Sequence, residues 1–187
     1  MQKIAARMAG YFVSHGYLTE SQKQVAVYGL DLALYTGLST LGLALWGVVL
    51  GRPWEALLII ALFYLNQTFG GGYHARSHLR CFTMMFLVLL IGLVTGPWPA
   101  LIEGIIALLS LTCLFAFPLI LHPNKQYLSG KRDLFARRSR MLVLCEAAFF
   151  CALFFFLSPA MRHAAAMGLF FSALSRAVAV AQRRYGG

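Results

Sequence analysis

Reactive and cationic side chains gather in one short stretch, residues 70–81, which reads GGGYHARSHLRC between two long apolar runs. It holds three glycines, two histidines, two arginines and a cysteine. A thiol beside an imidazole is the smallest apparatus for nucleophilic acyl chemistry, because the imidazole accepts the thiol proton. His74 precedes Cys81 by seven residues, close to two helical turns, so the two side chains are expected to come within reach. This stretch is therefore the candidate catalytic segment.

The surroundings of Cys81 favour its thiolate form. The cysteine is expected in or just before the first turn of a helix, where the positive end of the helix dipole stabilises an anion. Arg76 and Arg80 act in the same direction. The glycines permit backbone geometries that other residues resist, and they let a peptide substrate approach the main chain closely.

Other interpretations of the same residues remain open. His78 lies only three residues from Cys81 and is a rival general base. His74, His78 and Cys81 form the pattern H-x3-H-x2-C, which on one helix would present three metal ligands on one face. The segment contains no acid and two arginines that repel a cation, so we expect no metal and no other cofactor. The plainest alternative is a short cytoplasmic turn with incidental His and Cys.

Composition indicates the elements that must position this segment. The chain has 187 residues, 60% hydrophobic and 12% charged, with a mean hydropathy of +0.72. A soluble domain of this size cannot bury so much apolar surface. We predict an all-α, polytopic membrane protein with six transmembrane helices. The predicted spans are 25–50, 54–69, 82–97, 100–121, 141–157 and 160–181.

The first 24 residues are predicted to include an amphipathic helix that lies on the membrane surface. Ile4, Met8 and Tyr11 recur at helical spacing, and Lys3 and Arg7 lie opposite them. The whole chain, 1–187, is interpreted as one membrane domain. Its parts are the amphipathic segment 1–24, the first two spans 25–69, the catalytic segment 70–81, two spans 82–121, a basic loop 122–140, and the last two spans with a basic tail 141–187.

Charge predicts the orientation in the membrane. With the N-terminus inside, the cytoplasmic segments hold 14 of the 16 lysines and arginines, and Arg52 and Arg162 lie outside. Both termini, the catalytic segment and the basic loop are therefore expected at the cytoplasmic face of the cell membrane. The net charge of +10 then reflects topology and anionic lipids, and no nucleic-acid partner is expected. Glu103, near the outer face, is expected to extend its carboxylate to the membrane surface.

Polar groups near the cytoplasmic helix ends are further candidates. Ionisable side chains inside spans are costly, so Asp31 and Glu146 are expected to pair with an arginine or to orient a histidine. Asn66 and Gln67 are candidates to hydrogen-bond His74. The basic loop is expected to hold an acidic peptide tail by charge attraction as well as to fix topology.

Three parts of the chain resemble the accessory gene regulator B (AgrB) membrane peptidases of Gram-positive quorum-sensing systems. They are GGYHARSHLRC with its Gly-x-His-x6-Cys core, the block FPLILHPNKQYL…RRSR, and YGLDLAL in the first span. The resemblance implies a cysteine endopeptidase that removes the acidic C-terminal tail of a short amphipathic propeptide. Cys81 would carry the acyl group as a thioester, and His74 would be the catalytic histidine. An internal Cys or Ser of the propeptide would then close a thiolactone or lactone ring.

The resemblance also implies a homodimer, with the propeptide and membrane lipids as further partners. Some relatives carry Arg where this chain has Gln67, so no shared role is implied at that position. The expected substrate-binding residues are Gly71, Gly72, Arg76, Ser77, Arg80, Lys125, Lys131 and Arg132.

Two other functions compete with a peptidase. A small transporter or peptide exporter would place its polar groups near the bilayer midplane, often in internal repeats, whereas this chain shows its polar cluster at one surface and no repeat. A lipid-headgroup transferase would need acidic Mg²⁺ ligands, and the six scattered acids offer no such motif.

Overall fold

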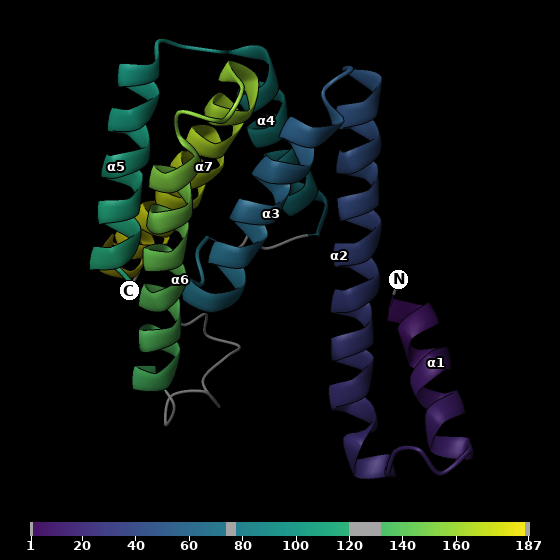
Figure 1. The fold of residues 1–187 in the computed structure, drawn as a ribbon. Helices are drawn as coiled ribbons and strands as arrows, with labels where there is room; N and C mark the ends of the chain where they lie inside the picture. The colour runs from purple at the N-terminus through teal and green to yellow at the C-terminus, as the bar shows by residue number, and fades with distance from the viewer. Residues whose placement is uncertain (1, 74–77, 120–131, 186–187) are drawn as a thin grey trace. The chain divides into compact units, whose positions relative to one another are not determined.

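The computed structural model describes residues 2–73, 78–119 and 132–185, and the regular secondary structure within these ranges consists of helices (Figure 1). The all-α prediction is therefore confirmed for the described residues. The α-helices are α1 (Gln2–Ser14), α2 (Lys23–Val49), α3 (Pro53–Gly70), α4 (His78–Val94), α5 (Ala100–Ala116), α6 (Arg132–Leu153) and α7 (Pro159–Tyr185), with a 3₁₀ helix, η1, at Glu20–Gln22.

Each predicted span coincides with a helix, but two helices begin earlier than expected. α4 starts at His78, four residues before the predicted span at 82–97. α6 starts at Arg132, so the prediction that a loop continues to residue 140 was wrong. Residues 132–140 contain no Gly or Pro, and Asp133 lies in the first turn, where the helix dipole stabilises a negative charge. The cationic residues 132–140 therefore form the first turns of α6, and not a loop in front of it.

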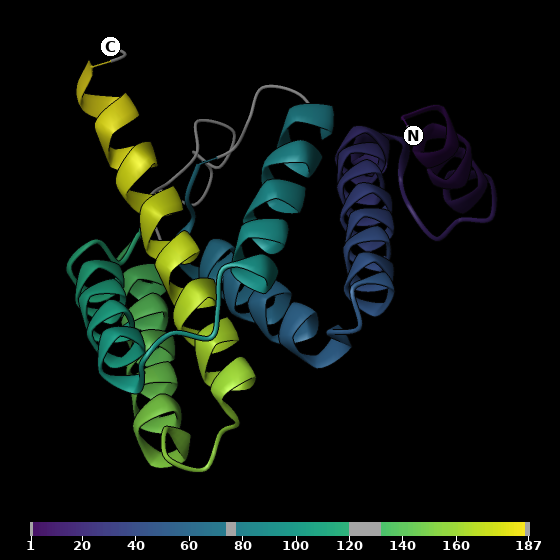
Figure 2. The same cartoon turned by 90° about the horizontal axis from the view of Figure 1, so that it is seen from above.

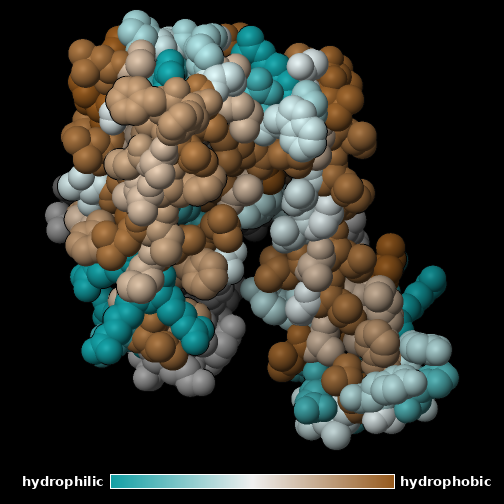
Figure 3. Space-filling view, in the orientation of Figure 1, coloured by the Kyte–Doolittle hydropathy of each residue, from teal (hydrophilic) through white to brown (hydrophobic). Residues whose placement is uncertain are grey.

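Two of the described helical stretches are long and apolar enough to cross a membrane. They are Glu20–Val49, which includes α2, and Pro159–Gln182 in α7. Leu79–Val94 and Ala100–Ala116 are apolar but shorter. Large hydrophobic side chains also remain exposed on the outer faces of the helices, among them Leu101 and Phe149. Figure 3 shows such residues over much of the visible face. This distribution is typical of a protein whose surroundings are lipid.

The described residues form two compact units, Met1–Leu45 and Trp46–Gly187. In the first unit, Ala5 and Ala9 of α1 are fully buried. Ile4 and Tyr11 are 55% and 57% exposed, so the larger apolar side chains of this helix remain available to a membrane surface. The amphipathic character expected for the N-terminal segment is thus present in α1.

The second unit is built around α7, which packs most extensively against α3 and α5 (Figure 2). Its hydrophobic core joins side chains of α5, α6 and α7. Small residues on α7 let neighbouring helices approach closely, as is common in membrane helix bundles. The core residues are Ala107, Leu111, Leu114, Val143, Phe150, Ala165, Ala166, Leu169 and Ala173. This packing makes α7 the rigid element against which the ends of α3 and α5 are placed.

Candidate functional site

The candidate catalytic segment leaves α3 through a glycine turn. α3 ends at Gly70, and Gly71 follows with φ +72°, a left-handed conformation that only glycine adopts easily. The Gly71 N–H donates to the main-chain oxygen of Gln67 at 3.1 Å and closes the helix. After the turn the chain reaches Tyr73, the last described residue before the segment 74–77.

Cys81 lies in the first turn of α4, which begins at His78, and its side chain is half-buried. This is the position in which the N-terminal end of a helix dipole stabilises a thiolate. His74, Arg76 and Ser77 lie outside the described residues, as does the side chain of His78. The pairing of Cys81 with either histidine therefore stays a prediction.

Tyr73 is tied to α7 by its backbone. Its N–H donates to both the main-chain oxygen and the Oγ of Ser175, at 3.1 Å each. The same Oγ accepts a hydrogen bond from Gln67 Nε2 at 2.5 Å. Gly72 is buried, and a Cβ at this position would lie 2.5–2.8 Å from the Gln67 carboxamide. The glycine makes room for this contact between the end of α3 and the catalytic segment.

Arg176, the next residue on α7, is fully buried. Its Nη1 donates to the main-chain oxygens of Leu114 and Phe117 at 2.8 and 3.0 Å, at the end of α5. Its Nη2 donates to the main-chain oxygen of Asn66, in α3, at 3.2 Å. Arg176 is one of the 14 basic residues that the charge distribution assigns to the cytoplasmic segments, but its side chain is buried and does not face lipid headgroups. The guanidinium is buried because the carbonyls at the ends of two helices need donors.

Asn66 and Glu146 form a second buried polar contact at this level. Asn66 Nδ2 donates to both carboxylate oxygens of Glu146, at 2.9 and 3.1 Å, and to the Leu62 oxygen of its own helix. Within the described part of the chain, Glu146 thus accepts hydrogen bonds from an amide, and it also interacts electrostatically with Arg176, one of the two kinds of partner expected for it. The side-chain amide oxygens of Asn66 and Gln67, Oδ1 and Oε1, have no hydrogen-bond partner among the described residues. The expected bond from either side chain to His74 remains untested.

The other predicted site residues are divided between the two units and the undescribed segments. Asp31 is half-buried in α2 of the first unit. Arg80 and Arg132 are exposed at the starts of α4 and α6. Lys125 and Lys131 lie outside the described residues. No group of three His, Cys, Asp or Glu side chains that could hold a metal is present in the described ranges.

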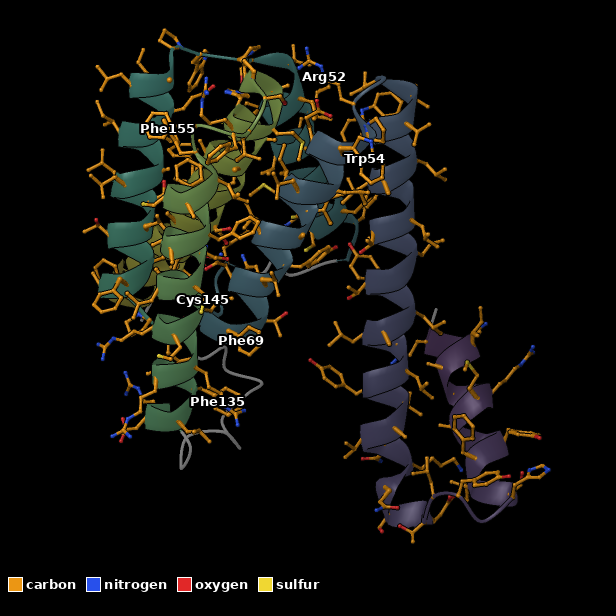
Figure 4. All side chains as sticks on the ribbon, viewed as in Figure 1. Arg52, Trp54, Phe69, Phe135, Cys145 and Phe155 are labelled. Atoms are coloured by element: carbon orange, nitrogen blue, oxygen red, sulfur yellow. The ribbon has the colours of Figure 1, made fainter. Side chains whose placement is uncertain are left out.

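Arginines continue along the first half of α6, where a hydrophilic patch is visible in Figure 3. The Arg138 guanidinium lies 6.0 Å from the Phe135 ring centroid, and that of Arg140 lies 5.6 Å from the Phe115 ring of α5. Both distances are typical of cation–π contacts. Figure 4 marks Phe135 near the start of α6, below Cys145, which is exposed on the same helix.

The opposite end of the second unit contains a buried ion pair. Glu103 is fully buried, and its Oε2 accepts a hydrogen bond from Arg162 Nε at 2.7 Å. Its Oε1 accepts the Trp98 N–H at 2.9 Å and lies 3.3 Å from His163 Nδ1. The expectation that Glu103 extends to the membrane surface was therefore wrong. The carboxylate turns inward because a cation and a backbone donor stabilise it there.

The sequence of this chain matches a known protein family. The family model for accessory gene regulator B (AgrB) matches residues 5–176. The chain belongs to the AgrB family. The matched range includes both His74 and Cys81, and it ends at the buried Arg176. Neither a curated protein nor a solved structure matches this chain. AgrB membership supports a role in the processing of quorum-sensing peptides, and with the apolar helices it indicates a membrane protein.

Sequence reasoning missed three polar residues that lie around the end of α3: Ser139, Ser175 and Arg176. The signal for Arg176 was present, because it lies inside the predicted span 160–181 and ionisable groups in spans are costly. Ser139 is fully buried, and a Cβ at Gly70 would lie 2.8 Å from its Oγ. Ser139 and Ser175 carried no comparable signal, since serines in apolar helices commonly bond to their own backbone.

Proposed function

We propose that this AgrB-family protein is a membrane cysteine endopeptidase that removes the C-terminal tail of a short propeptide and promotes its cyclisation. The observation that carries the proposal is the position of Cys81 in the first turn of α4, within a chain that matches the family over residues 5–176. A nucleophilic cysteine requires a stabilised thiolate and a general base. The start of a helix supplies the first, and His74, seven residues before Cys81 in the sequence, is the proposed base.

The proposed chemistry has two acyl transfers. Cys81 Sγ attacks the scissile carbonyl while its proton passes to His74, and the C–N bond breaks as the departing amine takes that proton. The propeptide is then held as a thioester on Cys81. An internal thiol or hydroxyl of the peptide gives its proton to His74 and attacks this thioester; the bond to Cys81 Sγ breaks, the sulfur regains the proton, and a thiolactone or lactone ring closes. Because the thioester preserves the activation of the acyl group, ring closure needs no ATP. A water-poor membrane junction protects the intermediate from hydrolysis.

The proposed setting is a six-span protein with both termini and the catalytic segment at the cytoplasmic face. The up-and-down course of the helices supports this setting. The end of α3, the end of α5 and the start of α6 lie at one end of the second unit (Figure 1). The exposed arginines of α6 lie at this end, where anionic lipids and the acidic tail of the propeptide would be bound. A homodimer is part of the same proposal.

The proposal is tested with protein purified in detergent and a propeptide that has an amphipathic segment, an internal Cys or Ser, and an acidic tail. We expect the unaltered protein to release the tail and to form a stalled acyl adduct on Cys81, detected by intact mass. Cys81→Ala and His74→Ala are expected to abolish both. Cys145→Ala is the matched control, because Cys145 is exposed on α6 and lies outside the catalytic segment. Cleavage by Cys81→Ala would reject the peptidase.

A further inference from the structure

We propose that Ser175 of α7 is a positioning residue that fixes the start of the catalytic segment. This inference rests on the proposed function, since it concerns how the protein places the histidine that follows Tyr73. Ser175 receives three hydrogen bonds from the end of α3 and the residues beyond it. Two come from the Tyr73 N–H and one comes from Gln67 Nε2.

The need for such a contact follows from the glycines. Gly71 and Gly72, which follow the end of α3, lack a Cβ and so give this connection more conformational freedom than other residues would. A nucleophile and its base must be held to within a fraction of an ångström, and a displacement of about 1 Å can lower a rate about 100-fold. A connection made of two glycines therefore requires an external anchor close to the catalytic histidine.

Tyr73 is the site of that anchor. Consecutive Cα atoms are separated by about 3.8 Å, so an anchor at Tyr73 acts one residue before His74 in the chain. The Tyr73 N–H bonds to both oxygens of Ser175 at 3.1 Å, which orients the peptide plane as well as its position. The Ser175 hydroxyl is thus shared between the Gln67 side chain of α3 and the backbone of Tyr73, which leads to the histidine.

Ser175 is itself held in place by its neighbour. Arg176 is fully buried and donates to carbonyls at the ends of α3 and α5, so this part of α7 has a fixed register relative to both helices. α7 also packs more extensively against α3 and α5 than against other helices. The anchor for the catalytic segment therefore lies on the most tightly packed element of the second unit.

The test compares three variants of the full-length protein. Ser175→Ala removes the shared hydroxyl and keeps the main-chain oxygen, and Ser175→Thr restores the hydroxyl. Ser172→Ala is the matched control, because Ser172 lies one turn earlier on α7 and donates only to Gly168 of its own helix. We expect Ser175→Ala to lower kcat for tail release by about 10- to 100-fold with KM unchanged. Ser175→Thr should recover most of kcat, and Ser172→Ala should leave it unchanged.

A second measurement separates positioning from loss of folding. Alkylation of Cys81 by iodoacetamide is followed across pH in detergent, with each cysteine resolved by mass spectrometry. We expect the pH curve of Ser175→Ala to approach that of His74→Ala, because the imidazole no longer stands beside the sulfur. The curves of Cys113 and of Ser172→Ala should match those of the unaltered protein.

The outcomes are distinct. If Ser175→Ala retains kcat and the Cys81 alkylation curve of the unaltered protein, the positioning role is wrong while the peptidase stands. Equal losses in Ser175→Ala and Ser172→Ala would also overturn it, since that result indicates a general effect on α7. If Cys81→Ala still cleaves, or His74→Ala leaves the alkylation curve unchanged, the proposed function fails and the inference fails with it.

Discussion

Arg176 on α7 donates from Nη2 to the main-chain oxygen of Asn66 at 3.2 Å, so a buried guanidinium from one helix holds the end of another. The same side chain reaches Leu114 and Phe117 at the end of α5. One cation therefore connects the helix that leads into the catalytic segment with the helix that leads toward the basic loop. The geometry of both connections therefore depends on Arg176.

The first prediction concerns this guanidinium. Lysine at position 176 keeps the charge but lacks the planar fork that serves three carbonyls, so buried acceptors lose their donors. We expect Arg176→Lys to lower the free energy of unfolding by about 1–3 kcal/mol. Thermal unfolding in detergent micelles measures the change. Arg138→Lys, at an exposed position on α6, is the control, and equal unfolding temperatures for the two variants would contradict the role of Arg176.

Gly70 provides a second, independent test of the same contact. A methyl group there would overlap the Arg176 guanidinium and crowd Ser139 Oγ. Gly70→Ala is therefore expected to destabilise the protein by about 1–3 kcal/mol. Gly37→Ala is the matched control in α2, where a Cβ meets no atom within 4 Å, and it should stabilise by about 0.5–1 kcal/mol. Unfolding temperatures that change in the same direction for both variants would show that Gly70 is not in close contact.

The buried Glu103 gives a third prediction, at the opposite end of the second unit. The Glu103 side chain is fully buried and pairs with the Arg162 guanidinium. Glu103→Gln replaces this carboxylate by a neutral amide and leaves the guanidinium without its counter-charge. We expect a loss of about 3–5 kcal/mol, as for other broken buried pairs. The control is Glu20→Gln, which alters an exposed pair with Lys23 and should change stability by less than about 1 kcal/mol. The double variant Glu103→Leu with Arg162→Leu should recover part of the loss, because no charge is left buried.

The sequence predicted the helices well because their signal is local. Long apolar runs bounded by Gly, Pro and charged residues place α2, α3, α5 and α7 within a few residues of the structure. The start of α6 was missed for a physical reason. Charge was taken as evidence for a loop, whereas arginine has high helix propensity and an exposed helix tolerates a cationic surface.

The partners of polar residues could not be predicted in the same way. Asn66 and Glu146 were both candidates, but their 80-residue separation gave no indication that they bond to each other. Asp31 and Glu146 were expected to have partners because ionisable groups within spans are costly. Arg176 also lies within a predicted span, but it was counted only as a positive charge that indicates orientation. Contacts of this kind are set by the register of packed helices, which depends on small residues such as those of α7 and not on any local pattern.

The fourth prediction concerns the acidic tail of the propeptide. Arg132 is exposed at the start of α6, in the cationic region proposed to bind this tail. Arg132→Glu is expected to raise KM several-fold with little change in kcat, because the interaction is one of charge attraction outside the reacting bond. KM of the unaltered protein should also rise with ionic strength. Lys3→Glu makes the same change in net charge on α1, and an equal rise in KM for it would rule out a local role for Arg132.

The final prediction tests orientation, on which the proposed function depends. In a chain without its native cysteines, Thr95→Cys lies exposed just after α4, and Arg132→Cys lies exposed at the start of α6. These positions belong to opposite ends of the helices, so the positive-inside rule places residue 95 outside and residue 132 in the cytoplasm. A membrane-impermeant maleimide added to intact cells should label Thr95→Cys and should reach Arg132→Cys only after permeabilisation. Labelling of Arg132→Cys in intact cells would place the start of α6, and with it the segment between α3 and α4, on the side where a cytoplasmic propeptide cannot reach it.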